Sequence, residues 1–72
     1  MTVVFILARP RGYSEGSPII DYVIEDRDNN VLATASTLPE AVHWTKERGY
    51  SPLVARIREF YDKSQPDQWR EA

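Results

Sequence analysis

The chain has 72 residues, no cysteine and a formal net charge of −2, from 9 basic and 11 acidic residues. Its length limits it to one domain, and its two tryptophans and four tyrosines exclude an intrinsically disordered chain, which lacks such apolar surface. The small negative charge gives no general attraction to nucleic acids or anionic membranes. The lack of cysteine argues for a reducing, cytoplasmic location rather than a disulfide-stabilised secreted fold.

The most apolar segment comes first. Residues 2–8 form a continuous hydrophobic, β-branched run, which predicts a strand buried on both faces. The run is far shorter than the roughly 20 residues that span a bilayer. Pro10 cannot donate a hydrogen bond to a sheet, so the strand should end near Arg9. Residues 9–18, with two prolines and two glycines, should form a loop.

A hairpin is predicted next. Residues 19–25 alternate in the manner of a strand with one face more buried than the other. Residues 26–30 are all Asp, Asn or Arg, and Asp and Asn favour turns because they tolerate left-handed backbone. Residues 31–35 then return as a third strand.

The clearest local signal is the start of a helix. The Thr37 side chain can accept from the amide of Glu40, while the Glu40 side chain reaches back to the amide of Thr37. The helix should run from residue 38 to about residue 48 and stop at Gly49, the expected left-handed position. Its apolar stripe, with Trp44 at the margin, consists of Leu38, Ala41, Val42 and Thr45.

The last two segments are a strand and a tail. Residues 52–60 alternate as a fourth strand, and residues 61–72 form a polar tail whose large apolar side chains are Tyr61 and Trp69. This order predicts a single α+β domain over residues 1–72, with a core of 1–60 and a tail of 61–72. We expect a four-stranded mixed sheet in the order 3-2-1-4, because the most apolar strand belongs in the middle and the helix crossover returns the fourth strand in parallel.

One predicted helix covers only one face of this sheet, which leaves the other face in need of a cover. The first strand is apolar on both faces, with Val3, Phe5 and Leu7 on one and Val4, Ile6 and Ala8 on the other. Each such side chain left in water forgoes roughly 1.5–3 kcal/mol. Two covers are available: the tail, through Tyr61 and Trp69, or a second copy of the chain.

No catalytic, metal or cofactor motif is predicted. Asp26, Asp28 and Asn30 have the spacing that opens a calcium-binding EF-hand loop, but Val31 and Thr37 stand where that loop needs glycine and glutamate. The one histidine, His43, has no cysteine with which to build a zinc site and is interpreted as a solvated helix residue. We therefore expect a protein that is not an enzyme and binds no cofactor.

A basic and aromatic patch is the candidate interaction surface. If the fourth strand lies beside the first, two arginine pairs should approach each other, and the tail could add a stacking platform. The residues of this candidate surface are Arg9, Arg11, Arg56, Arg58, Trp69 and Arg70. Nearby acidic residues could neutralise the arginines, and Trp69 is alternatively a packing residue.

The middle of the chain resembles short bacterial and phage proteins of unknown function. Thr37, Glu40 and Ala41 begin the helix in the same way, and Gly49 is followed by a Pro-led strand at Pro52. The element order is also similar to that of HicB-type antitoxin domains, a resemblance that implies a dimeric partner of a toxin, often with an appended DNA-binding segment.

These observations lead to two expectations about function. The first is a non-enzymatic protein–protein interaction domain, a homodimer, motivated by the uncovered face of the sheet. The alternative is a small nucleic-acid-binding protein that uses Arg9, Arg11, Arg56 and Arg58.

Overall fold

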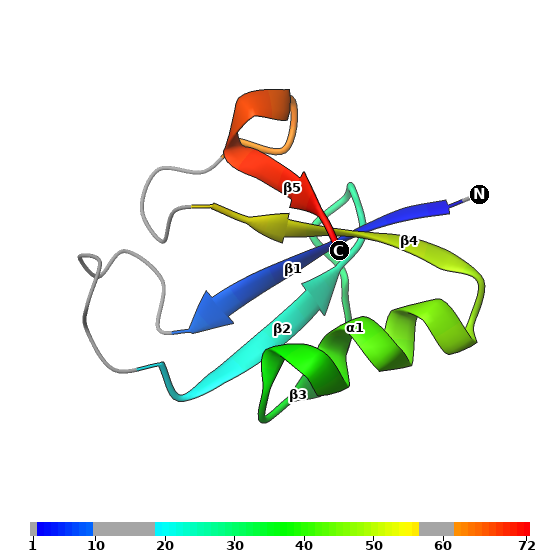
Figure 1. Ribbon diagram of the computed structural model, residues 1–72. Coiled ribbons are helices and arrows are strands. Elements are labelled where there is room, and N and C mark those ends of the chain that lie inside the picture. The colour runs from blue at the N-terminus through cyan, green and yellow to red at the C-terminus, as the bar shows by residue number, and fades with distance from the viewer. Residues whose placement is uncertain (1, 10–18, 57–61) are drawn as a thin grey trace.

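The hydrophobic run at the start of the chain lies at the centre of a mixed sheet (Figure 1). A computed structural model describes residues 2–9, 19–56 and 62–72. The sheet contains β1 (Thr2–Arg9), β2 (Asp21–Glu25), β3 (Val31–Ala35), β4 (Tyr50–Ala55) and β5 (Trp69–Glu71). Their order is β3-β2-β1-β4-β5. The α+β class and the order of the first four strands are confirmed, with β1 antiparallel to β2 and parallel to β4.

The prediction of four strands was wrong, because the tail contributes a fifth. Trp69–Glu71 pairs antiparallel with β4, after a short 3₁₀ helix, η1 (Pro66–Gln68). This segment has only three residues, and two of them are charged. Its alternation of apolar and polar side chains is therefore too short to predict a strand. Their pairing with β4 depends on Trp69 being drawn into the core.

The bounds of two other strands differ from those predicted. The second strand begins at Asp21 rather than residue 19, because Arg9, the last residue of β1, pairs with Asp21. The fourth strand begins at Tyr50, directly after the helix, and ends at Ala55. The remainder of the predicted strand, from residue 57, lies outside the described residues.

The helix α1 (Leu38–Glu47) has the predicted ends. The Thr37 hydroxyl accepts from the amide of Glu40 at 3.3 Å. Gly49 follows the helix with a φ of 76°, the left-handed conformation that favours glycine. Its amide donates to the carbonyl of Lys46 at 3.1 Å, so the turn also satisfies a carbonyl at the end of the helix.

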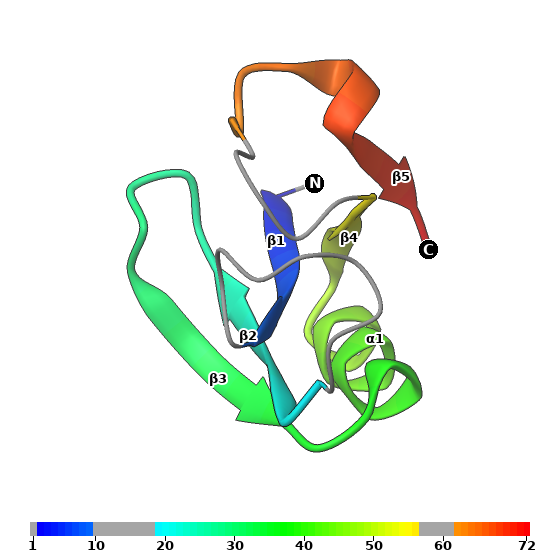
Figure 2. The same ribbon diagram turned by 90° about the vertical axis from the view of Figure 1, so that its left-hand side faces the viewer.

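Alternate residues of β1 pack on opposite faces of the sheet, as the sequence predicts. Figure 2 shows α1 on one side of the sheet and the tail on the other. The cluster on the helix side consists of Val4, Ile6, Ile24, Ala41 and Val54. The cluster on the tail side consists of Phe5, Leu7, Val23 and Trp69.

Candidate interaction surfaces

The predicted arginine patch does not converge in the structure. Arg9 ends β1 and turns toward β2, where its guanidinium forms an ion pair with Asp21 and its Nε donates to Oδ1 at 2.7 Å. This hydrogen bond, more than the charge itself, holds the pKa of the Asp21 carboxyl below its usual value. Of the two arginines that the patch was expected to present at this end of β1, Arg9 therefore has its charge balanced by a carboxylate.

Arg56 turns the other way. It follows β4, and its Nε donates to the backbone carbonyl of Trp69, in β5, at 3.3 Å. Because β2 and β5 lie on opposite sides of the central β1–β4 pair, Arg9 and Arg56 are drawn apart. Arg11 and Arg58 lie outside the described residues.

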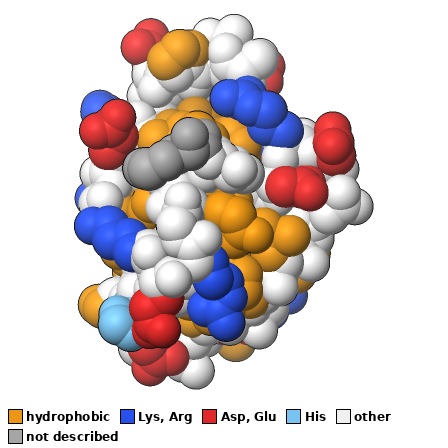
Figure 3. Space-filling view, turned by 90° about the vertical axis from the view of Figure 1, so that its right-hand side faces the viewer, with side chains coloured by type: hydrophobic (Ala, Val, Ile, Leu, Met, Phe, Trp, Pro, Cys, Tyr) orange, Lys and Arg blue, Asp and Glu red, His pale blue; other side chains and the backbone are white. Residues whose placement is uncertain are grey.

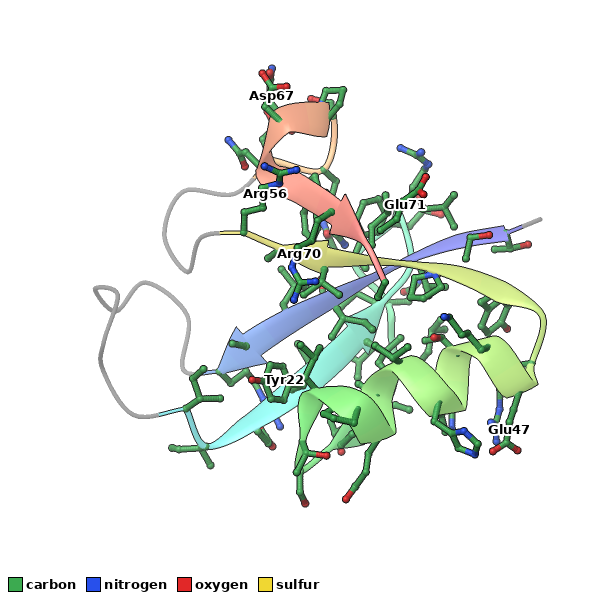
Figure 4. The ribbon with its side chains drawn as sticks, in the orientation of Figure 1. Tyr22, Glu47, Arg56, Asp67, Arg70 and Glu71 are labelled. Atoms are coloured by element: carbon green, nitrogen blue, oxygen red, sulfur yellow. The ribbon has the colours of Figure 1, made fainter. Side chains whose placement is uncertain are left out.

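The two tail residues of the predicted patch are also separated. Trp69 is only 5% exposed, so its ring belongs to the core and is not a surface for stacking bases. Arg70 is exposed and pairs with Val54, a residue of the helix-side cluster. Figure 4 shows it projecting toward the side of α1, whereas Arg56 lies against β5. Of the four described members, Arg56 hydrogen-bonds to the backbone of Trp69, whereas the side chains of Arg9 and Arg70 project toward β2 and toward the side of α1.

Trp69 joins the tail to the sheet. Its ring meets that of Phe5 edge to face, with 4.7 Å between the ring centroids. Its indole Nε1 donates to the carbonyl of Asp62 at 3.0 Å, which satisfies the polar atom of a buried side chain. The tail is therefore the cover that the structure shows on the second face of the sheet, one of the two alternatives that the sequence leaves open.

Lys63 makes a second connection, which sequence reasoning missed. Its ammonium donates to a carboxylate oxygen of Glu25 at 2.9 Å, to the carbonyl of Asp26 at 2.6 Å and to Oδ1 of Asn29 at 2.7 Å. The side chains of Lys63 and Glu25 are only 15% and 4% exposed. The ammonium also lies 5.1 Å from the centroid of the Phe5 ring. Three donors of one cation thus bind the tail to the turn between β2 and β3.

β3 carries two of the four large hydrophobic side chains that are exposed in the described residues. Val31 is 59% exposed and Leu32 is 37% exposed. The strand has no charged residue and no proline, and nothing in the part of the chain that the structure describes pairs with its outer edge. Natural proteins commonly protect such edges with lysine, proline or a covering segment, because unpaired backbone groups invite another strand.

Two more exposed hydrophobic residues lie in line with β2, the second strand from this edge. Ile19 and Ile20, 45% and 75% exposed, come just before β2. Tyr22 pairs with Ala35, the last residue of β3, so Ile20 lies beyond the end of that strand. The large hydrophobic side chains that are exposed in the described residues therefore lie at the start of β3 and just before β2, toward opposite ends of this hairpin.

The sequence contained part of the signal for this surface. The prediction placed the strand 31–35 at the edge of the sheet, and an uncharged, apolar strand at an edge is by itself a candidate for pairing. The contribution of residues 19 and 20 was hidden, because they were assigned to the second strand.

A groove lies on a different side of the molecule, beside the first residues of β4. Its volume is about 720 Å³. It is lined mainly by apolar side chains, including Val3, Tyr50, Pro52 and Leu53, with Lys46 and Glu71 as the charged members. Figure 3 faces this side and shows hydrophobic side chains gathered near its centre with charged ones around them.

Within residues 2–9, 19–56 and 62–72, no group of three or more histidine, cysteine or acidic side chains is arranged to hold a metal ion. Nor is any helix in those ranges both long and apolar enough to cross a membrane.

Comparison of the chain with protein-family models, curated proteins and solved structures found no match.

Proposed function

We propose that this chain is a non-enzymatic protein–protein interaction domain that forms a homodimer, with the outer edge of β3 in the interface. The observation that carries the proposal is an edge strand that is uncharged, partly apolar and unpaired among the described residues. Backbone N–H and C=O groups on such an edge bind another strand directly, and exposed side chains on either side of it add apolar contact area.

The location of the interface differs from the one that the sequence first suggests. The second face of the sheet motivated dimerisation, but Trp69 and Lys63 bind the tail across that face. A partner would have to displace them, at the cost of exposing Phe5, which is fully buried. The edge of β3 needs no such displacement, because Val31 and Leu32 are already exposed.

The size of the edge sets the expected affinity. β3 has five residues, so a strand pair buries less area than the roughly 1,200–2,000 Å² of a stable interface. We therefore expect a weak dimer, with a dissociation constant of about 10–100 µM. We propose that it forms in a cytoplasm in which the chain is abundant or two copies are held close together.

Light scattering coupled to size exclusion tests the proposal. From about 10 µM to about 1 mM, the average mass should rise from that of one chain toward that of two. Leu32→Lys should keep the protein monomeric across the range, because it places a charge on the edge strand. Gln65→Lys, at an exposed position in the tail, is the matched control and should dimerise normally. A constant monomer mass for the unmodified chain would overturn the proposal.

The nucleic-acid alternative gains no specific support from the described arginines. Arg9 forms an ion pair with Asp21, and Trp69 is buried rather than available for stacking. A nucleic acid that binds this patch would therefore meet residues most of which, among those described, already contact other groups of the protein.

A further inference from the structure

We infer that a cavity on the tail side of the sheet binds a free α-amino acid with an apolar side chain. The cavity has a volume of about 350 Å³, within the range of small-molecule sites. Arg27 and Glu71 supply opposite charges to its lining, and Leu53, Pro66 and Trp69 supply apolar surface. The inference does not depend on the proposed homodimer, because none of these residues belongs to β3.

The strand register places apolar side chains between the two charges. Phe5 of β1 lies opposite Leu53 of β4, and Leu53 lies opposite Glu71 of β5. The Arg27 guanidinium lies over the Phe5 ring, 5.5 Å from its centroid. Glu71 is therefore two strands away from the ring beneath Arg27, which is about 10 Å across a sheet with strands ~4.8 Å apart.

Both charges are available to a ligand. Within the described residues, the side chains of Arg27 and Glu71 form no hydrogen bond or ion pair, and both residues are exposed. A third charged group at the cavity, the ammonium of Lys63, differs from them. It already donates to Glu25 and twice to the turn between β2 and β3, which uses all of its hydrogens. The cavity thus offers a ligand one guanidinium and one carboxylate.

These two groups select the class of ligand. A guanidinium binds a carboxylate through paired hydrogen bonds, and a carboxylate binds an ammonium group. An α-amino acid carries a carboxylate and an ammonium on one carbon atom. With a hydrogen bond of about 2.9 Å at each end, it fits between two side chains that reach toward each other over ~10 Å. Its side chain would lie against Leu53, Pro66 and Trp69, so an apolar side chain is favoured over a charged one.

Titration with leucine, followed by NMR, tests the inference. Trp69 lines the cavity and Trp44 does not, so the indole N–H signal of Trp69 should shift on binding while that of Trp44 serves as an internal reference. We expect a dissociation constant of about 1 mM, because the ligand is small and the site is open to solvent. Isocaproate lacks the amino group of leucine and isoamylamine lacks its carboxylate. Each should bind about tenfold more weakly or worse.

Two substitutions assign the binding groups. Arg27→Gln removes the partner of the ligand carboxylate and Glu71→Gln removes the partner of its ammonium, and each should weaken leucine binding about tenfold. Arg70→Gln is the matched control. Figure 4 shows Arg70 and Glu71 projecting to opposite sides of β5, so this variant loses a charge beside the site without changing its lining. All three positions are exposed, and circular dichroism confirms that each variant is folded.

The outcomes decide the inference separately from the proposed function, which light scattering tests. Weaker leucine binding by Arg27→Gln and by Glu71→Gln, but not by Arg70→Gln, supports the inference. No shift of the Trp69 indole signal up to about 20 mM leucine would overturn it. It would also be overturned if either variant bound leucine as tightly as the unmodified protein does, or if isocaproate bound as tightly as leucine.

Discussion

Asp26 shows how one side chain organises the turn between β2 and β3. One of its oxygens accepts from the amides of Asp28, at 2.8 Å, and Asn30, at 2.9 Å, and the other accepts from the side chain of Asn30 at 3.0 Å. Asn29 adopts the left-handed conformation that closes the turn, with a φ of 68°. The sequence predicts this turn from its Asp and Asn content, because these residues bond their own backbone and tolerate such a φ.

The charge of Asp26 should make stability depend on pH. The hydrogen bonds from Asn30, followed by smaller contributions that include the charge of Lys63, hold the pKa of Asp26 below its usual value of 3.8. The stabilisation of the folded state by the ionised Asp26 carboxylate is therefore fully present above pH 3.8. It is lost as the pH falls through the lower pKa that Asp26 has in the folded state. Asp26→Asn should flatten the fall in the free energy of unfolding between about pH 5 and pH 2.5.

Urea titrations at several pH values measure this difference. Asp67→Asn, at an exposed position, serves as the control and should retain the slope of the unmodified protein. Equal slopes for Asp26→Asn and the unmodified protein would show that the ionisation of Asp26 does not contribute to folding.

At the scale of elements, α1 is the part of the molecule that local chemistry defines best. Thr37 begins it, Gly49 follows it, and Ala41 and Thr45 of the predicted stripe are buried against the sheet. The start, the end and the inward face depend on residues within about one turn of each other, so they follow from the sequence alone. β5 is the opposite case, because its formation depends on a partner strand 14 residues or more away.

Gly49 should be sensitive to substitution for a conformational reason only. A methyl group added at its α-carbon would meet no atom within 4 Å, so the cost of Gly49→Ala comes from its φ of 76°. We expect a loss of about 1–2 kcal/mol in the free energy of unfolding. Gly49→Asn should lose less, because asparagine adopts left-handed backbone more readily. Chemical denaturation followed by circular dichroism gives both values, and equal stability for all three proteins would contradict this explanation.

At the scale of the whole molecule, the sheet is covered by two unlike layers. The helix covers one face through its own apolar stripe. The other face is covered in part by the tail, which adds one large ring, one lysine and a short strand. A chain of this length has one small core to stabilise it. Both layers should therefore be needed for folding.

Truncation of Trp69 should show the contribution of the tail. Trp69→Ala removes a ring that is packed against Phe5 and should lower the free energy of unfolding by about 3–5 kcal/mol. Trp69→Phe keeps a ring there but loses the hydrogen bond to Asp62, at a cost of about 1–2 kcal/mol. Arg70→Ala, at the next and exposed position, is the control. If Trp69→Ala were as stable as Arg70→Ala, the tail would not be part of the folding unit.

The sequence by itself determined the features that depend on near neighbours. These are the two-faced first strand, the hairpin with its turn and the ends of α1. It determined them because hydrophobic periodicity, capping and turn chemistry act over a few residues.

Only the tertiary structure decided which distant groups meet. It showed that the ring of Trp69 packs against Phe5 and that Lys63 forms an ion pair with Glu25. It also showed that Arg9 and Arg56 turn to opposite sides of the central strands. It also placed residues 19 and 20 in line with β2, beyond the end of β3. The physical reason is that partners separated by 12 to 64 positions are selected by packing and charge in the assembled fold, for which a single sequence has no local pattern.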